Sequence, residues 1–528
     1  MRAMAFARAF GAVTLVAAIA GCGPKAWTPH ADGFESVRRA MIDRPRRVIY
    51  NTDGNDMMLY PTNLPITAEA FESIRLKHTE GTRIDSVFYC PQSSGFCYLT
   101  TRKAGEFLSA DYRPAASPVR NAAADFAASG TDALEMASAY CRRRGLEIFV
   151  SLRMNDTHDN GGMQKPGAID PHFPPFKRNH PDWLMGSVTN RPRLCAWTAV
   201  DYAHEGVRAH LRKTVADLVS NYDVDGVEYD FFRHLQLFRT VANLNDATAD
   251  ELGVMNALMR ELRTVTENAG RKRGKPFLVA VRVPDSVGMC RAVGIDLESW
   301  MREDLVDLVI GSSYFQLNRW RTTADLVHAA GKRFYASLDE PRNQRKRAPL
   351  GLLPGRGKSV PFYRARAAAA VESGADGYYL FNIEGQDLGR LASIDAKSVS
   401  GKWINFAVPR ATALAQLRHY CRDPYRFYRL PAIEPQQPHR LPSGGSYSFT
   451  MEIGTEPCAA IVRLLTDLGT MAEVKVSVNG VGLERIGFDK GVFAYAVPAS
   501  VLRRGDNAIG VFAPVDCRLA DFSLESRE

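Results

Sequence analysis

Residues 224–234 read VDGVEYDFFRH, a stretch that has the apolar character of a buried strand but carries two acidic side chains. Glu228 and Asp230 lie two residues apart, so on a strand both side chains point to the same face. A buried charge is costly unless it is paired or used. The fold must therefore bury this strand and also give its two carboxylates a partner or a function.

Runs of the same type recur along the first two thirds of the 528-residue chain. Each is short, apolar and rich in β-branched and aromatic residues, and polar loop residues follow it. The eight runs span 46–53, 84–90, 146–154, 224–232, 276–283, 305–315, 332–340 and 375–383. Helix-like segments precede the third, fourth and fifth runs, at 130–145, 205–222 and 256–274.

Strands that alternate with helices predict a parallel sheet, and eight such units in one domain predict a closed (β/α)8 barrel, the TIM barrel. An open, doubly wound α/β sheet is the alternative, but no GxGxxG follows the first run. We expect the barrel, with a C-terminal extension, to span residues 44–429.

The C-terminal part changes character after a proline-rich linker at residues 430–445, LPAIEPQQPHRLPSGG. Beyond it, apolar and polar residues alternate with a period of two, and Gly, Asn and Asp separate the runs. This pattern predicts an all-β sandwich over residues 446–528, similar to a jelly roll. The sandwich would either bind carbohydrate or be purely structural.

The N-terminus, residues 1–22, has the features of an export signal. A positively charged start precedes the apolar segment GAVTLVAAIA, which is too short to remain as a membrane-spanning helix. The sequence Ile19-Ala20-Gly21-Cys22 resembles a bacterial lipobox. We therefore expect a lipoprotein that is exported and anchored to a membrane, on its periplasmic or cell-surface side, through lipid on Cys22. A plain signal peptide with an incidental Cys22 is the alternative.

The composition fits a soluble globular protein, with 45% apolar and 24% charged residues. The net charge of +9 is scattered, and no basic helix is interleaved with aromatic residues, so we expect no nucleic-acid partner. Eight cysteines besides Cys22 are an even number for an exported protein, and the pairs 90/97 and 458/517 are candidate disulfides. No Cys/His cluster indicates a metal, and no cofactor is expected.

The alternation of side chains along a strand predicts where the two acids of residues 224–234 lie in the barrel. Gly226, Glu228 and Asp230 would face the barrel interior, with Asp230 last, at the C-terminal mouth. A carboxylate at the C-terminal end of a barrel strand is typical of a catalytic group. We predict that Asp230 acts directly and is not deeply buried, and that Glu228 supports it. The alternative is a structural salt bridge from Asp230 to Arg233 or Arg282.

Polar and aromatic side chains at the other strand ends and in the loops converge on the same face of the predicted barrel. Together they suit a polyhydroxylated substrate, so we expect a carbohydrate. The candidate substrate-binding residues are Asp53, Arg153, Asp156, His158, Trp183, Arg233, Arg282, Tyr314, Gln316, Asn318 and Asn382.

Glycoside hydrolysis needs two carboxyl groups, one acid and one nucleophile or base. Glu340, at the end of the seventh run, is our choice for the general acid, and Asp285, Asp156 and Glu384 are the alternatives. A weaker hypothesis is a metal-dependent hydrolase that uses Asp156 and His158.

Several motifs together resemble the bacterial glycosyl hydrolase-like barrels related to the glycosyl hydrolase-like 10 group. They include RRVIYNTDGND, EIFVSLRMNDTHD, HPDWLMG, DVDGVEYDFFRH and GADGYYLFN. The resemblance implies a TIM barrel and a carbohydrate substrate. The DGxxxD core is also similar to chitinase-type barrels, DGxDxDxE, but Phe232 stands where their catalytic Glu would be.

The C-terminal segment is similar to galactose-binding-like jelly rolls appended to glycosidases. From the residues and the resemblance together, we expect a glycoside hydrolase that acts on a polysaccharide or oligosaccharide by two-carboxylate acid/base catalysis. The alternative is a non-catalytic glycan-binding lipoprotein with a degenerate barrel.

Overall fold

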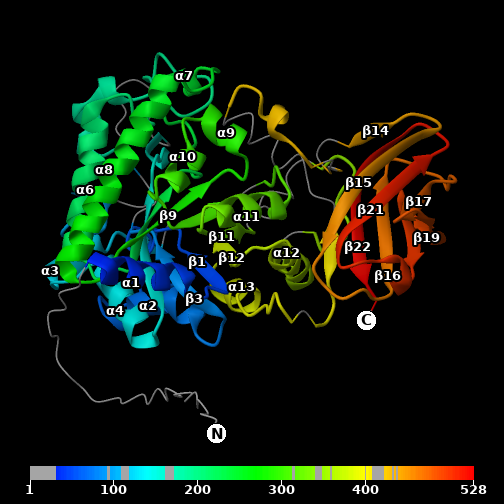
Figure 1. Ribbon diagram of the computed structural model, residues 1–528, viewed down its shortest axis with the longest axis horizontal. Coiled ribbons are helices and arrows are strands. Elements are labelled where there is room, and N and C mark those ends of the chain that lie inside the picture. The colour runs from blue at the N-terminus through cyan, green and yellow to red at the C-terminus, as the bar shows by residue number, and fades with distance from the viewer. Residues whose placement is uncertain are drawn as a thin grey trace, which may run out of the picture.

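The computed structural model describes residues 31–91, 95–108, 118–160, 172–311, 315–338, 348–356, 359–398, 400–406, 421–430, 433, 435 and 438–527. It has two parts, an α/β barrel and a C-terminal antiparallel β-sandwich that lies beside it (Figure 1).

The barrel consists of eight parallel strands that pair in chain order and close between the first and the last. Each strand lies within one of the eight runs that predicted it, so the (β/α)8 prediction is confirmed. The strands are β1 (Val48–Asn51), β3 (Ile84–Tyr89), β7 (Glu147–Arg153), β8 (Gly226–Asp230), β9 (Leu278–Val283), β10 (Leu308–Gly311), β11 (Arg333–Ser337) and β12 (Gly377–Phe381).

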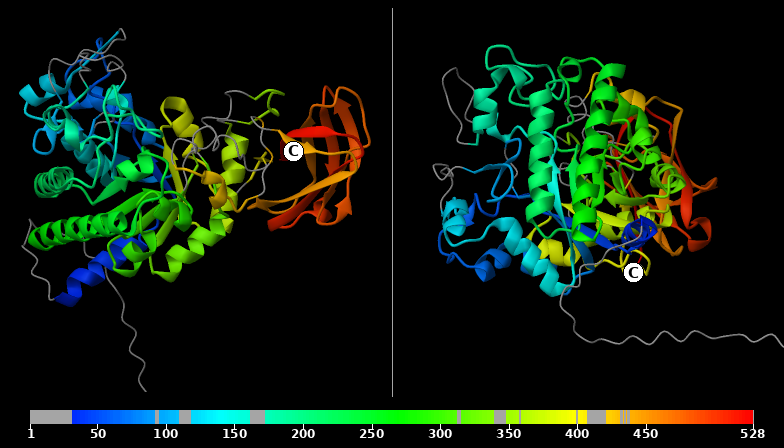
Figure 2. Two further views of the ribbon diagram at one scale, coloured as in Figure 1. Left: turned by 90° about the horizontal axis from the view of Figure 1, so that it is seen from above. Right: turned by 60° about the vertical axis from the view of Figure 1, so that its left-hand side comes forward.

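Helices surround the barrel, and Figure 2 shows the long helices α6 and α8 side by side on its outside. The described helices are α1 (Ala31–Asp43), α2 (Ala68–Ile74), α3 (Ala123–Ala128), α4 (Ala133–Arg144), α5 (Pro175–Asn179), α6 (Glu205–Asn221), α7 (Arg239–Ala242), α8 (Ala249–Arg273), α9 (Val287–Ala292), α10 (Leu297–Arg302), α11 (Trp320–Ala329), α12 (Val360–Glu372) and α13 (Gly385–Leu391). Short 3-10 helices are Leu76–Thr79, His158–Asn160, Pro181–Trp183, Pro424–Phe427 and Ala499–Val501.

The sequence specifies the ends of the longest helix, α8. Thr248 caps its N-terminus by accepting a hydrogen bond from the backbone of Glu251, whose side chain returns to the Thr248 N–H. Gly274 ends the helix in the left-handed conformation, at φ 73°, which glycine adopts without steric cost.

The sandwich contains two antiparallel sheets. One has the order β13-β22-β16-β20-β19, with β14 also paired to β22, and the other has the order β15-β21-β17-β18. The strands are β13 (Ile404–Phe406), β14 (His439–Leu441), β15 (Gly445–Ile453), β16 (Ala460–Thr466), β17 (Lys475–Val478), β18 (Val481–Gly482), β19 (Glu484–Asp489), β20 (Val492–Val497), β21 (Gly505–Ala513) and β22 (Cys517–Ser526). Two small sheets in the barrel loops pair β2 (Tyr60–Pro61) with β6 (Val119–Arg120) and β4 (Tyr98–Leu99) with β5 (Glu106–Phe107).

The sandwich sheet begins earlier in the chain than the sequence pattern indicates. β13 lies within residues 44–429, and β14 lies within the proline-rich segment 430–445, yet both pair with β22 near the C-terminus. Each of these two strands has only three residues, which is too few to show the alternation of apolar and polar residues that predicts a strand.

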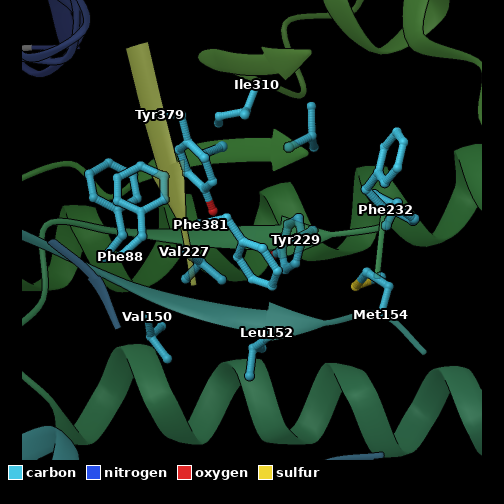
Figure 3. Close-up of a cluster of buried hydrophobic side chains, with 14 of the residues drawn as sticks. Phe88, Val150, Leu152, Met154, Val227, Tyr229, Phe232, Ile310, Tyr379 and Phe381 are labelled. Carbon is cyan, nitrogen blue, oxygen red and sulfur yellow. The ribbon is translucent and has the colours of Figure 1, made fainter. Parts of the chain in front are cut away.

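Side chains along β8 alternate between the barrel interior and the helices. Tyr229 faces outward, near Arg263 of α8, and Figure 3 shows Val150 and Leu152 of β7 directed toward the helical layer in the same way. Gly226 faces inward, where an added Cβ would lie 2.3 Å from the Phe149 ring. The Phe149 ring therefore occupies the interior beside Gly226, and Glu228 and Asp230 follow above it on the same face of β8.

The sandwich is fixed to the barrel through α12 (Figure 1). Gly454, just after β15, approaches α12 so closely that a Cβ would lie 2.0 Å from the backbone carbonyl carbon of Ala368. A buried ion pair joins the two parts as well, since Arg356 Nε donates to Asp521 Oδ2 over 2.9 Å. Close backbone contact and a buried ion pair indicate a defined position of one domain against the other.

Neither predicted disulfide is present. Cys97, Cys458 and Cys517 are free thiols, so the pairs 90/97 and 458/517 were wrong. Closeness in sequence for 90/97, or a shared C-terminal segment for 458/517, does not give the two Cβ atoms of a pair the geometry that a disulfide requires. Within the part of the chain that the structure describes, no helix is both long and apolar enough to cross a membrane.

Candidate active site at the barrel mouth

Asp230 ends β8 and points into the barrel beside Arg282 of the neighbouring strand β9. Arg282 Nη1 donates to Asp230 Oδ2 over 3.0 Å, and the backbone N–H of Phe232 donates to Asp230 Oδ1 over 3.0 Å. Arg282 also lies 4.0 Å from the centroid of the Phe381 ring, a cation–π contact. Asp230 is 1% exposed, so the prediction that it is not deeply buried was wrong.

Glu228 lies one layer below Asp230 and is completely buried. Its Oε2 accepts hydrogen bonds from Asn51 Nδ2 at 2.9 Å and from Ser151 Oγ at 2.5 Å. Its Oε1 accepts from the Tyr379 hydroxyl at 2.9 Å. Burial, and next the negative charge of Asp230, raise the pKa of Glu228 to about 7. The carboxyl group is thus held in a fixed position from three other strands of the barrel.

Arg153, at the end of β7, joins two carboxylates at the mouth. Its Nη1 donates to Asp156 Oδ2 over 3.0 Å, and its Nη2 forms an ion pair with Asp53, which follows β1. Burial alone would raise the pKa of Asp53, but the Arg153 and Arg233 guanidinium groups outweigh it and lower that pKa. The Asp53 side chain is 20% exposed, so its carboxylate is accessible from the mouth.

Asp156 in turn orients His158. Asp156 Oδ1 lies 2.9 Å from His158 Nδ1, and His158 Nε2 lies 2.9 Å from Arg233 Nη2. A guanidinium can only donate, so Nε2 is the acceptor and the proton of neutral His158 lies on Nδ1. Although burial alone would raise it, His158 and then Arg153 hold the pKa of Asp156 well below its usual range. The His158 side chain is 41% exposed.

A second group of predicted residues lies on the loop after β10. Asp285, which follows β9, accepts backbone hydrogen bonds from Leu317 and Asn318 at 2.9 and 3.0 Å. Burial raises the pKa of Asp285 to about 7. Gln316 Oε1 accepts from Arg366 Nη2 of α12 over 2.7 Å. Asp285 therefore holds this loop in place, and Gln316 faces away from the mouth, toward α12.

Trp183 and Asn382 occupy different surroundings. The Trp183 indole stacks on His180, with ring centroids 3.7 Å apart and planes at 4°, and it lies against Gly206 at the start of α6. This face of the indole is therefore not open to a sugar ring. Asn382, directly after β12, has a φ of 55°, and its Oδ1 is buried with no hydrogen-bond partner among the described residues.

Several predicted residues lie outside the described residues, namely Glu340, the choice for the general acid, Tyr314 and Cys22. Of the alternatives to Glu340, Glu384 forms an ion pair with Arg75 at 2.7 Å. Over the described residues, no group of three or more His, Cys, Asp or Glu side chains is arranged to hold a metal ion. Asp159, next to the Asp156–His158 pair, is bonded to Lys177 instead, at 2.6 Å.

The sequence reasoning did not single out the three side chains that hold Glu228. Ser151 lies two residues before Arg153, and Tyr379 two residues before Phe381, so strand alternation carried the signal in both cases. Asn51 lies two residues before Asp53 in the same way. Once the residue at the end of a barrel strand is assigned to the site, the residue two positions before it is predicted to face the interior below that site.

No known family model and no curated protein matches the sequence, so the family inferred from its motifs stays a prediction. Solved structures with a similar fold include several glycoside hydrolases. A GH138 enzyme targeting pectin rhamnogalacturonan II is 12% identical, with a TM-score of 0.36, and the match covers 64% of this chain and 35% of that one. The PgaB (BpsB) glycoside hydrolase domain from Bordetella bronchiseptica is 11% identical, with a TM-score of 0.38 and coverage of 66% and 99%.

A family GH18 chitinase from Chromobacterium violaceum is 10% identical, with a TM-score of 0.35 and coverage of 89% of both chains. This protein spans about a third of the length of the GH138 enzyme. The similarity is one of fold at low identity, so the function has to be argued from the residues at the barrel mouth.

Proposed function

We propose that the chain is an exported, lipid-anchored glycoside hydrolase whose substrate binds over the C-terminal mouth of the barrel. The observation that carries the proposal is the convergence there of Asp230 with the network of Asp53, Arg153, Asp156 and His158. Carboxylates and cationic donors in one place provide both a nucleophile or base and hydrogen bonds to sugar hydroxyls.

In this proposal each group has a separate task. Asp230 is the nucleophile or base, and Glu340 is the general acid. Asp53, His158 and Arg233 are accessible and hold hydroxyl groups of the substrate. Glu228 is a positioning residue, because its carboxyl group lies under Asp230 and contributes to the electrostatic potential there. Since Asp230 is almost completely buried, substrate binding has to displace side chains above it.

The test is hydrolysis of a panel of polysaccharides and oligosaccharides by the chain without residues 1–21. Asp230→Asn should reduce kcat/KM by about 10²–10⁴-fold, the usual contribution of a positioned carboxylate. Asp489→Asn, the same change at an exposed position of β19, is the matched control. Hydrolysis that continues undiminished in Asp230→Asn removes Asp230 from the reaction.

One observation favours a second candidate function, a glycan-binding lipoprotein without catalysis. At the mouth, Asp53 and Asp156 are both paired with Arg153, and Asp230 is paired with Arg282. Phe232 also occupies the place of the chitinase-type acid. This candidate predicts that the wild-type chain binds an oligosaccharide but releases no reducing ends over long incubation.

A further inference from the structure

Helix α1 lies across the N-terminal ends of the barrel strands, opposite the mouth. Its Phe34 packs on the end of α8, where a Cβ added to Gly270 would lie 3.2 Å from the Phe34 ring. Further along α1, Arg39 Nη1 donates to the backbone carbonyl of Gly331, just before β11, over 2.7 Å. Figure 1 shows α1 at the lower end of α8, with α7 at the upper end, beyond the mouth end of β8. The exposed side of α1 is therefore part of the surface opposite the mouth.

Four exposed cationic side chains gather on and around α1. Arg39 lies on the helix, and Arg44 directly follows it. Arg271 and Lys272 belong to the last turn of α8. The two helices meet there, because the Arg271 guanidinium lies 4.5 Å from the centroid of the Phe34 ring. We call these four cationic residues the basic rim.

The protein neutralises the basic rim only in part. Among the residues that the structure describes, no carboxylate lies within 4.0 Å of Arg44 or Lys272, and Arg44 only approaches a backbone carbonyl. The acids nearest to the other two members are Asp43 and Glu267, at 3.5 and 3.8 Å. Glu35, an exposed acid on α1, is already paired with a buried arginine at 3.2 Å. The rim therefore keeps positive charge that an anionic partner can neutralise.

The covalent distance to Cys22 identifies a partner. Positions 22 and 31 are nine residues apart, and α1 begins at Ala31. A fully extended chain spans at most about 3.5 Å per residue, so these two residues are separated by no more than about 30 Å. Lipid on Cys22 would thus keep the basic rim within about 30 Å of the bilayer surface.

A tethered surface needs little affinity of its own. The tether raises the effective concentration of the membrane at the rim, so a few weak contacts suffice to hold one orientation. Lys and Arg side chains are attracted to anionic lipids over about 8 Å at physiological ionic strength. A basic surface beside an acyl chain is also the second signal that makes lipid anchoring stable.

We propose that the basic rim docks on the anionic phospholipids of the membrane that carries the lipid anchor, with the barrel mouth directed away from the bilayer. The inference rests on the lipid anchor of the proposed function and is independent of the hydrolase activity. In this orientation a large glycan reaches the mouth without meeting the membrane. A soluble polyanion offers the same charge, but the nearness of Cys22 favours the membrane.

The first measurement is sedimentation of the non-acylated chain, without residues 1–21, with two kinds of vesicle. Vesicles of phosphatidylglycerol and phosphatidylcholine in equal parts should bind it about tenfold or more tightly than phosphatidylcholine alone at low salt, and high salt should remove the difference. Arg44→Gln/Lys272→Gln removes two cations without breaking an ion pair and should weaken binding to the mixed vesicles about tenfold. Arg440→Gln/Lys475→Gln, at exposed positions of the sandwich, removes the same charge and should leave binding unchanged.

The second measurement is hydrogen–deuterium exchange of the acylated protein in the same vesicles. Peptides from α1 and from the last turn of α8 should exchange more slowly in the mixed vesicles than in phosphatidylcholine. Peptides from α7, at the mouth, should exchange equally in both. Melting temperatures check that each variant is folded.

Equal binding to both kinds of vesicle, or protection of α7 in place of α1, overturns the inference. Binding to heparin that the rim variant loses, without binding to the mixed vesicles, identifies a soluble polyanion as the partner and overturns it as well. The lipid anchor is tested separately. Fatty-acid labelling of Cys22 without any preference for the mixed vesicles refutes the rim alone. A preference that the rim variant loses, in a chain whose Cys22 takes up no fatty acid, refutes the anchor and supports the rim.

Discussion

Asp230 and Arg282 form an ion pair across neighbouring strands, with 3.0 Å between Asp230 Oδ2 and Arg282 Nη1 and no more than 1% of either side chain exposed. Two charges are costly to bury, and the pair remains acceptable only while both partners are present. The barrel strand can therefore bury the carboxylate of Asp230 because Arg282 pairs with it.

The first prediction follows from this pairing. Arg282→Met leaves Asp230 as a buried, uncompensated charge and should reduce the free energy of unfolding by about 3–5 kcal/mol. Urea unfolding of the chain without residues 1–21 measures it. Arg440→Met, at an exposed position of β14, is the control.

The double variant Asp230→Asn/Arg282→Met removes both charges. It should lose clearly less than the sum of the two single variants, since the partners are coupled. Strict additivity, or an Arg282→Met chain as stable as wild type, would show that the pair does not contribute as the geometry indicates.

The second prediction concerns pH. The pKa of Glu228 is about 7 in the folded chain against an ordinary value of 4.5, so the folded state retains a proton that the unfolded state has released. The stabilisation is complete below the ordinary value and is lost as the pH rises through about 7. The stability of wild type relative to Glu228→Gln should therefore fall between about pH 5 and pH 8, by on the order of 2 kcal/mol.

Asp285 should also lower the stability of the folded chain as the pH rises, since burial raises its pKa to about 7 as well. Glu228→Gln should consequently reduce the pH dependence of stability, and Glu228→Gln/Asp285→Asn should reduce it further. Urea titrations at a series of pH values measure both slopes. A wild-type chain whose stability rises from about pH 5 to pH 8 relative to Glu228→Gln would contradict the assignment.

The barrel could be read from the sequence because its signal is local. Each strand carries a short apolar run, and the helix-like segment predicted at 256–274 ends where α8 does, at Gly274, although α8 begins earlier, after Thr248. Alternation along β8 also predicted that Glu228 and Asp230 share a face, and the hydrogen bonds of Glu228 to Asn51 and Tyr379 place that face inside the barrel.

The degree to which a side chain is buried, and the contacts between segments far apart in sequence, could not be predicted in the same way. Alternation says which way Asp230 points but not how tightly the neighbouring strand packs, so its burial was missed. The docking of the sandwich was missed for a related reason, because β15 and α12 are far apart in sequence and only the folded chain brings them together.

The third prediction tests the lipid anchor. Cys22→Ser should abolish labelling by a radioactive fatty acid in a bacterial host and release the protein from the membrane fraction, because membrane attachment then lacks its acyl chains. Cys195→Ser, at a free cysteine of the barrel part, is the control. The fractions are washed at high salt, which screens attraction between the basic chain and anionic lipids. Label retained by Cys22→Ser would rule out this residue as the acylation site.

The fourth prediction concerns the docking of the sandwich. In Gly454→Ala the added Cβ would meet the Ala368 carbonyl carbon at 2.0 Å, and both atoms belong to backbones that cannot rotate away. The sandwich should therefore shift or detach from α12, which opens the buried Arg356–Asp521 pair to water. We expect a larger radius of gyration by small-angle scattering and faster proteolysis between the two parts.

Gly469→Ala is the matched control, because nothing lies within 4 Å of a Cβ at that position. A Gly454→Ala chain with unchanged scattering and proteolysis would mean that the close approach at Ala368 does not determine the domain arrangement.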